Sequence, residues 1–173
     1  MGLDVANTAV TQIVPDETNT RELRNAFGQF ATGVTLVTVN SPDGVVGIVA
    51  NSFSSVSLTP PMVLWCPDRN SRRYKYFETA EHYAIHVLSA DQQDICWAVA
   101  KDAYALRDKS LAENDQGVPL LEDCLARFEC RRHAAYEGGD HVIMLGTVER
   151  AQLRQEGEPL TFFKGKAGRF LAD

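Results

Sequence analysis

The chain has 173 residues, of which 45% are hydrophobic, and this length suits one domain with a sizeable core. Its formal net charge of -6, without a basic patch interleaved with aromatic residues, argues against a nucleic-acid-binding surface. No apolar run reaches the ~20 residues that a membrane-spanning helix needs. We therefore expect a globular protein that partners neither nucleic acid nor membrane.

The cysteines and the N-terminus favour a reduced cytoplasmic protein. The first residues lack the positive segment and apolar core of a signal peptide. Residues 1–18 are polar and aperiodic, so we expect a loose N-terminal arm before one domain at 19–173. The cysteines show no CxxC or zinc-type spacing, so we expect no metal site and treat them as small core residues: Cys66, Cys96, Cys124 and Cys130.

The region after the arm predicts an amphipathic helix followed by a hairpin. The helix begins at Asn19 or Thr20 and ends at Gly33. Two strands rich in β-branched residues should follow at 34–39 and 45–50, joined by a tight turn. The helix residues expected to pack on the sheet are Leu23, Ala26, Phe27 and Phe30.

The rest of the chain alternates short strands and helices. Ser71 is predicted to cap one helix, and Ser89 with Gln92 forms the capping box of another. Residues 101–120 read as a charged, variable excursion. The further expected strands are 62–66, 82–88, 126–136, 141–153 and 159–165. Six or seven strands with two or three helices and no βαβ alternation favour a closed or partly closed antiparallel barrel.

Residues 47–61, GIVANSFSSVSLTPP, lead from an apolar strand into small polar residues and stop at two prolines. Short hydroxyl and amide side chains beside free backbone amides can closely approach an anionic, hydroxyl-rich ligand. We therefore place a cofactor here, with a solvated serine loop as the alternative. The chain has no GxGxxG turn and no GKS or GKT, so neither a Rossmann domain nor a P-loop is predicted.

Three further blocks accompany this segment: ATGVTLVT at 31–38, LWCPDRNSRR at 64–73 and GGDHVIMLG at 138–146. Together the four blocks resemble the short-chain flavin reductase family, the reductase partners of two-component flavin monooxygenases. The resemblance covers about residues 21–170. It implies a mainly β, Greek-key-like antiparallel fold with a few helices, the FMN-binding split β-barrel, in a homodimer.

The resemblance also implies an activity and a set of binding residues. The activity is an NAD(P)H:flavin oxidoreductase that reduces FMN or FAD with NADH or NADPH and supplies reduced flavin to a partner monooxygenase. Ser71 and an adjacent arginine, preferably Arg72, suit a phosphate, with a solvated basic pair as the alternative. The implied flavin-binding residues are Gly33, Val34, Thr35, Ala50, Asn51, Ser52, Ser55, Val56, Ser57, Asn70, Ser71, Arg72 and Arg73, with Cys66 packing near the ring.

Asp140 and His141 follow paired glycines and are the implied nicotinamide contacts, with His141 as the catalytic residue. Asp140 can orient the imidazole, and His141 can donate to a carboxamide or a phosphate. A structural histidine at a strand start is the alternative. The other histidines are interpreted as structural: His82, His86 and His133.

Two departures from the family pattern stand out. Val49 replaces a threonine two residues before Asn51, so a polar contact to the flavin edge is either absent or made by backbone. Phe170 stands later than the usual C-terminal tyrosine. Two other functions stay open: a flavin- or haem-binding carrier or sensor without NADH turnover, and an enzyme resembling pyridoxine-phosphate oxidase, for which we find no substrate phosphate site.

Overall fold

The computed structural model describes residues 10–170, so the expectation for residues 1–9 lies outside the described part of the chain. Residues 10–19 contain no helix or strand, and the first element is α1 (Thr20–Phe27). Among residues 10–170, none of the helices combines the length and the hydropathy that a membrane-spanning helix requires.

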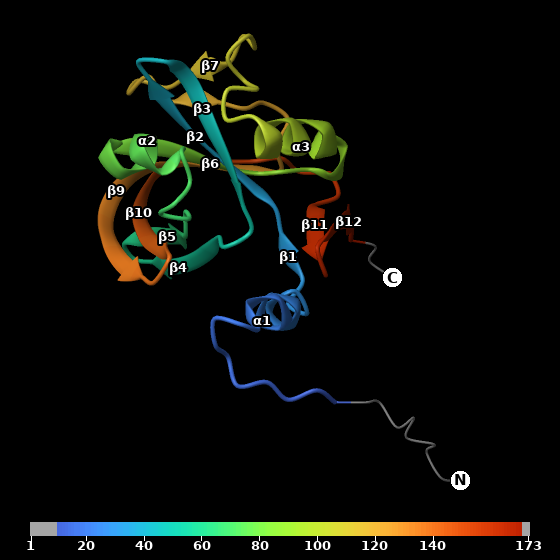
Figure 1. Cartoon of the computed structure of the whole chain (residues 1–173). Coiled ribbons are helices and arrows are strands. Elements are labelled where there is room, and N and C mark those ends of the chain that lie inside the picture. Colours follow the sequence, from blue (N-terminus) through green and yellow to red (C-terminus); the bar gives the residue numbers. More distant parts are fainter. Residues whose placement is uncertain (1–9, 171–173) are drawn as a thin grey trace.

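A strongly curved antiparallel sheet of seven strands, in the order β3-β2-β6-β9-β10-β5-β4, forms the main body (Figure 1). In this sheet β6, β9 and β10 are neighbours, and β5, which precedes β6 in the chain, lies on the other side of β10. This connectivity is Greek-key-like. The edge strands β3 and β4 do not pair, so the barrel is open between them. The prediction of a mainly β, antiparallel fold is confirmed. The strands are β2 (Thr35–Ser41), β3 (Gly44–Ala50), β4 (Ser54–Leu58), β5 (Pro61–Trp65), β6 (His82–Val87), β9 (Ala126–Gly138) and β10 (His141–Leu153).

Smaller elements cover this sheet. A three-stranded sheet pairs β1 (Thr32–Gly33) with β11 (Leu160–Phe163) and β11 with β12 (Lys166–Arg169). The predicted strand at 159–165 is thus the first strand of a hairpin, and the second strand was not predicted. The excursion contains the short pair β7 (Ala112–Glu113) and β8 (Pro119–Leu120). The helices are α2 (Tyr74–Thr79) and α3 (Gln93–Lys101), the latter preceded by the 3₁₀ turn η1 (Ala90–Gln92). As the capping-box prediction requires, Ser89 N–H donates to the Gln92 side chain (3.1 Å).

Two buried clusters hold these layers together. Inside the barrel, Trp65 meets Phe77 edge to face with ring centroids 5.2 Å apart, and both are fully buried. Under α3, Leu36 of the sheet packs with Val99 and Leu106. Because β6 lies between these clusters, four consecutive residues of it are buried, and its sequence shows no alternation. All four cysteines are free. The prediction that they are core residues is confirmed for Cys96, Cys124 and Cys130, whereas Cys66 is half-buried.

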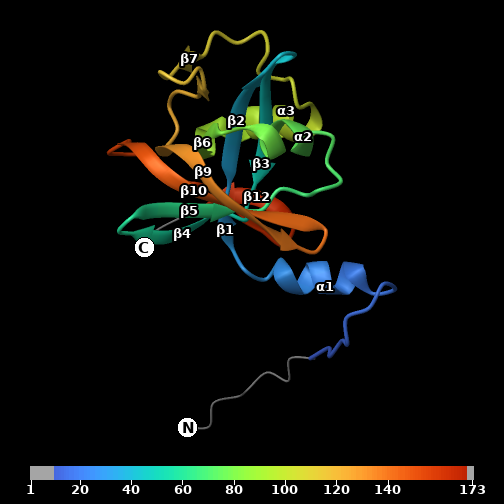
Figure 2. The same cartoon turned by 90° about the vertical axis from the view of Figure 1, so that its left-hand side faces the viewer.

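The helix prediction was wrong at its end and at its apolar face. α1 stops at Phe27, and backbone bonds from Gln29 N–H to Ala26 and from Phe30 N–H to Phe27 tighten the chain into turns. Gly33 lies in β1 instead. Phe27 and Phe30 are 69% and 77% exposed, and α1 stands apart from the seven-stranded sheet in both views (Figures 1 and 2). The described chain therefore does not cover the apolar face of α1.

The prediction that Ser71 caps a helix was also wrong. α2 begins at Tyr74, after a chain of turns in which Asp68 accepts from Asn70 N–H (2.8 Å) through its carboxylate and from Ser71 N–H (3.1 Å) through its carbonyl. The Ser71 hydroxyl accepts a bond from Arg73 N–H (3.3 Å) and belongs to this turn. Phe77 on α2 is fully buried and anchors this short helix to the core of the barrel.

Candidate functional site

The ends of β2 and β3 bring two of the predicted segments together. Thr35 pairs with Ala50 across the strands, and its hydroxyl donates to the Ala50 carbonyl (2.8 Å). Beside them lies an open cavity of about 560 Å³, within the ~300–1,000 Å³ range of ligand sites. Its lining includes Gly33, Val34, Thr35, Asn51 and Ser52, together with residues 30–32, 53–54 and Val87.

Two features of the wall of this cavity leave room for a ligand that forms hydrogen bonds. Nothing lies within 4 Å of the position that a Cβ atom on Gly33 would take, so the backbone there faces open space. Thr32, also in the lining, holds a buried hydroxyl with no hydrogen-bond partner among the described residues. A bound ligand could lie against the open backbone at Gly33 and form a hydrogen bond with the unpaired Thr32 hydroxyl.

Ser52 connects this cavity to the segment after β5. Its hydroxyl accepts from Cys66 N–H (2.9 Å) and donates to the Cys66 carbonyl (3.3 Å). Burial raises the pKa of the Cys66 thiol, opposed by the hydrogen bond from Ser52. Cys66 is therefore held as a neutral, half-buried thiol, which fits packing near a ligand rather than nucleophilic chemistry.

The same segment reaches the predicted nicotinamide contacts. Val142 N–H donates to the Pro67 carbonyl (3.1 Å), Arg69 N–H donates to the Asp140 carbonyl (2.9 Å), and Asp68 forms an isolated β-bridge with His141. Residues 66–69 thus join the cavity to the turn before β10. Blocks far apart in sequence meet along this loop.

His141 is oriented by its neighbour in the chain. Its Nδ1 lies 2.8 Å from an Asp140 carboxylate oxygen, and this hydrogen bond lowers the pKa of that carboxyl group. The imidazole side chain is 45% exposed, and Nε2 has no hydrogen-bond partner in residues 10–170. The arrangement presents one oriented ring nitrogen to a ligand.

Arg73, rather than the Arg72 preferred from the sequence, lines a cavity together with Asn51. Its guanidinium donates to the Val99 and Ala100 carbonyls at the end of α3 (2.7 and 3.1 Å). Burial lowers the pKa of this guanidinium, and the nearby Asp102 carboxylate opposes that effect. A cavity of about 300 Å³ lies beside it, lined also by Val34, Val49, Asn51, Cys96, Trp97, Ala100, Phe162 and Ala167. Val49, which stands where the family pattern has a threonine, therefore contributes an apolar wall to this cavity.

Some predicted residues do not join this cluster. Ser55 and Ser57 lie on the edge strand β4, paired with β5 around a bulge at Val56, and no cavity described here is lined by these three residues. Asn70 is exposed in the turn, and Ser71 and Arg72 border a separate cavity. The sequence reasoning missed other walls, Phe30, Phe53, Trp97 and Phe162, because single apolar residues give no signal until the fold places them.

Comparison with known proteins identifies the class. Residues 27–170 match the family described as "Flavin reductase like domain", and the chain belongs to this family. It is 50% identical to "FMN reductase (NADH) SmoA" of Agrobacterium fabrum, over 91% of this chain and 90% of that protein. It is 33% identical to "Flavin-dependent monooxygenase, reductase subunit HsaB" of Rhodococcus jostii, over 84% of this chain and 75% of that protein.

A solved structure shows the same fold with ligands. It is "Streptomyces globisporus C-1027 NADH:FAD oxidoreductase SgcE6 in complex with NAD and FAD fragments", with a TM-score of 0.85 and 35% identity. The alignment covers 94% of this chain and 99% of that chain. The family predicted from the four sequence blocks is confirmed.

Proposed function

We propose that this protein is an NAD(P)H:flavin oxidoreductase that reduces FMN or FAD. The observation that carries the proposal is the loop at residues 66–69, which joins the cavity at Gly33 and Ser52 to the oriented His141. The names of the relatives, an NADH-dependent FMN reductase and an NADH:FAD oxidoreductase, support it.

The residues have separate tasks in this proposal. Asn51 and Ser52 hold the isoalloxazine beside the open backbone at Gly33. Asp140 keeps the His141 ring in one orientation, so that Nε2 binds the nicotinamide nucleotide over the ring. When bound, the flavin supplies the acceptor for hydride. The protein then needs no nucleophile, which agrees with the neutral Cys66 thiol.

The test is an assay of the purified chain with flavin and reduced nicotinamide, followed by the loss of reduced-nicotinamide absorbance. We expect turnover with FMN or FAD. A carrier or sensor, flavin- or haem-binding, would bind its ligand without consuming NADH. Inert mixtures with both flavins and both nicotinamide nucleotides would overturn the enzyme proposal.

The product of this reaction is proposed to serve a separate monooxygenase. The name of the Rhodococcus jostii relative, a reductase subunit of a flavin-dependent monooxygenase, supports this role. A monooxygenase that lacks its own reductase supplies the test, because its product should form only when this chain, NADH and flavin are all present.

We also propose a cytoplasmic homodimer. The four free cysteines suit a reducing compartment. Phe27 at the end of α1 and Phe30 in the turn after it are exposed, and they offer an apolar surface that a second copy can cover. Residues 1–18 are proposed to be an arm outside the domain. Light scattering on the purified chain reports its oligomeric state directly.

A further inference from the structure

A groove of about 670 Å³, which we call the α3 groove, lies between α3 and the segments 109–111 and 121–123. Its floor is aliphatic. Leu121 is buried there, and Ile95 and Leu111 are half-buried and pack against the same cluster under α3. The α3 groove therefore exposes aliphatic carbon to water, and another molecule that covered it would gain from burying that surface.

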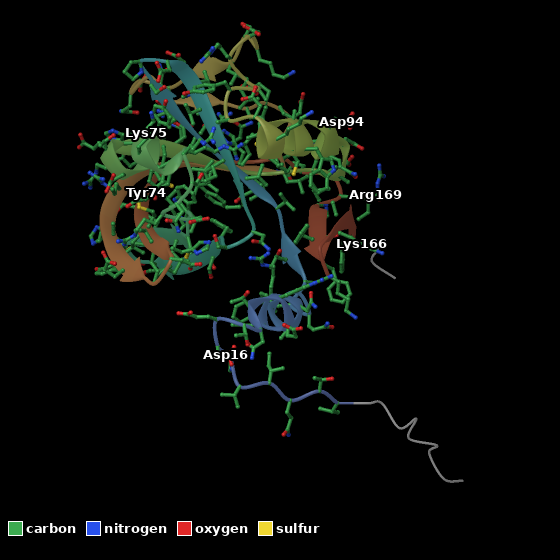
Figure 3. All side chains as sticks on the ribbon, in the orientation of Figure 1. Asp16, Tyr74, Lys75, Asp94, Lys166 and Arg169 are labelled. Carbon is green, nitrogen blue, oxygen red and sulfur yellow. The ribbon has the colours of Figure 1, made fainter. Side chains whose placement is uncertain are left out.

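Acidic side chains surround this apolar floor. Against one exposed cation, Lys109, the lining holds four exposed carboxylates: Asp91, Asp94, Glu122 and Asp123. Two of them have cationic partners, because Asp91 pairs with Arg169 (3.5 Å) and Glu122 with Arg127 (3.7 Å). Asp94, labelled on α3 in Figure 3, and Asp123 form no salt bridge within residues 10–170. The α3 groove is therefore complementary to a positively charged ligand.

Charge also selects the kind of molecule that this groove can hold. A second copy of the chain carries the same net charge of -6, so like charges oppose its approach. Residues 1–9 and 171–173, which lie outside the described structure, contain no lysine or arginine to match the acidic rim. The complementary occupant is a segment of a different protein, with aliphatic side chains between lysines or arginines.

The helix α3 separates this groove from the proposed flavin site. Ile95 and Ala98 line the α3 groove, whereas Trp97 and Ala100 line the 300 Å³ cavity together with Asn51. With 3.6 residues per turn, these two pairs occupy opposite faces of the helix. A helix with its side chains is ~10–12 Å wide, so a protein docked in the groove lies about one helix diameter from that cavity.

We propose that the α3 groove docks a basic, partly aliphatic segment of the oxygenase that receives reduced flavin from this chain. The aliphatic side chains of the segment pack on Ile95 and Leu111, and its cations pair with Asp94 and Asp123. Docking at this position keeps released flavin close to its acceptor and raises its effective concentration there. The choice of the oxygenase as the partner rests on the proposed function, whereas the chemistry of the segment does not.

The first experiment measures the binding of a probe peptide, two leucines flanked on each side by lysines, to the whole chain by fluorescence anisotropy. Asp94→Lys is compared with Glu81→Lys, because both reverse an exposed carboxylate that forms no salt bridge. Glu81 precedes the far end of β6, about 20 Å along the strand from η1. We expect the peptide Kd to rise about tenfold in Asp94→Lys and less than about twofold in Glu81→Lys.

A matched peptide with serines in place of the leucines tests the aliphatic floor, and we expect it to bind about tenfold more weakly. Equal effects of Asp94→Lys and Glu81→Lys, equal Kd values for the two peptides, or no binding at about 1 mM peptide would overturn the proposal. Asp94 lies in the first turn of α3, where negative charge stabilises a helix, so thermal denaturation checks the fold of the variant. Asp123→Asn is a second variant, because asparagine tolerates the left-handed backbone there (φ 59°).

The second experiment tests the oxygenase as the occupant, with the monooxygenase that forms its product from flavin reduced by this chain. At limiting flavin, we expect its product per NADH consumed to fall about threefold or more with Asp94→Lys and to stay constant with Glu81→Lys. NADH consumption by the chain alone should not change, because Asp94 lines neither the 560 Å³ nor the 300 Å³ cavity. An unchanged yield would overturn the oxygenase as the partner, and dissociation of a wild-type dimer by Asp94→Lys in light scattering would assign the groove to a second copy instead. A chain that consumes no NADH would contradict the proposed function and leave the peptide result intact.

Discussion

His141 and His86 each hold a hydrogen bond at Nδ1, but their surroundings differ completely. His141 is half-exposed beside the Asp140 carboxylate. His86 is fully buried, where Nδ1 lies 2.9 Å from the Leu36 carbonyl and Leu121 N–H donates to Nε2 (3.0 Å). His86 must therefore be neutral, with its proton on Nδ1, and it ties the excursion to the sheet.

We expect His141→Ala to raise the KM for NADH about tenfold or more, while the flavin Kd changes less, because the ring is assigned to the nicotinamide nucleotide. Asp140→Asn keeps the ring and removes the charge that orients it, so a smaller rise is expected. Steady-state kinetics and flavin titration measure the two quantities. Equal effects on both ligands would contradict the assignment.

The buried His86 predicts a pH dependence of stability. Burial lowers its pKa to about 4 from an unfolded value of 6.5, so between these pH values only the unfolded chain binds the proton. The free energy of unfolding should therefore rise with pH across this window, by about 3 kcal/mol at most. The stabilisation from His86 is fully present above pH 6.5 and is lost as the pH falls toward 4.

Urea denaturation from pH 4.5 to 7.5 measures this rise. His86→Gln should flatten the pH profile, while His133→Gln, at an exposed position, should preserve it. A wild-type profile with the same slope as His86→Gln would exclude His86 as the cause.

At the scale of elements, the packing of β10 depends on a close contact between the Gly146 backbone and the Tyr83 side chain. A Cβ atom added at Gly146 would clash with the Tyr83 hydroxyl and come within 3.3 Å of Cys130 Cβ, and both neighbours are buried. Gly146→Ala should therefore destabilise the protein by roughly 1–3 kcal/mol, since either the tyrosine or the strand must move.

Gly168→Ala on β12 is the matched control, because its nearest neighbour would be 3.6 Å away in ordinary contact. Chemical denaturation of the two variants makes the comparison. Similar midpoints for Gly146→Ala and wild type would show that the Tyr83 ring moves aside freely.

The strands were predictable from residue type, whereas the helix ends were not. Val, Ile and Thr runs marked β2, β3 and β10, because branched side chains favour the pleated backbone. α1 and α2 were misjudged at Gly33 and Ser71, since turns at Phe30 and Asp68 compete locally with the helix. Such competition is decided by a few hydrogen bonds that composition does not reveal.

At the scale of the whole molecule, the exposed face of α1 predicts that the chain associates. We expect Phe27→Ser to shift a wild-type dimer toward monomer, because the 69% exposed ring would be buried between copies. Light scattering with size-exclusion chromatography measures this shift. Leu153→Ser, at a 72% exposed apolar residue of β10, is the control, and a monomeric wild type would contradict the proposed homodimer.

Residue order was enough to predict the antiparallel strand class, the family and the chemical character of the candidate site, because strand propensity and short polar motifs are local properties. Which of those residues meet depends on how distant segments pack. This packing joined Ser52, Cys66 and His141 along one loop and separated Ser55 and Ser57 on an edge strand. The packing also set Ser71 and Arg72 at a cavity other than the one that Asn51 and Ser52 line. Cavities and their shared walls arise from packing between segments distant in the chain, which no local pattern encodes.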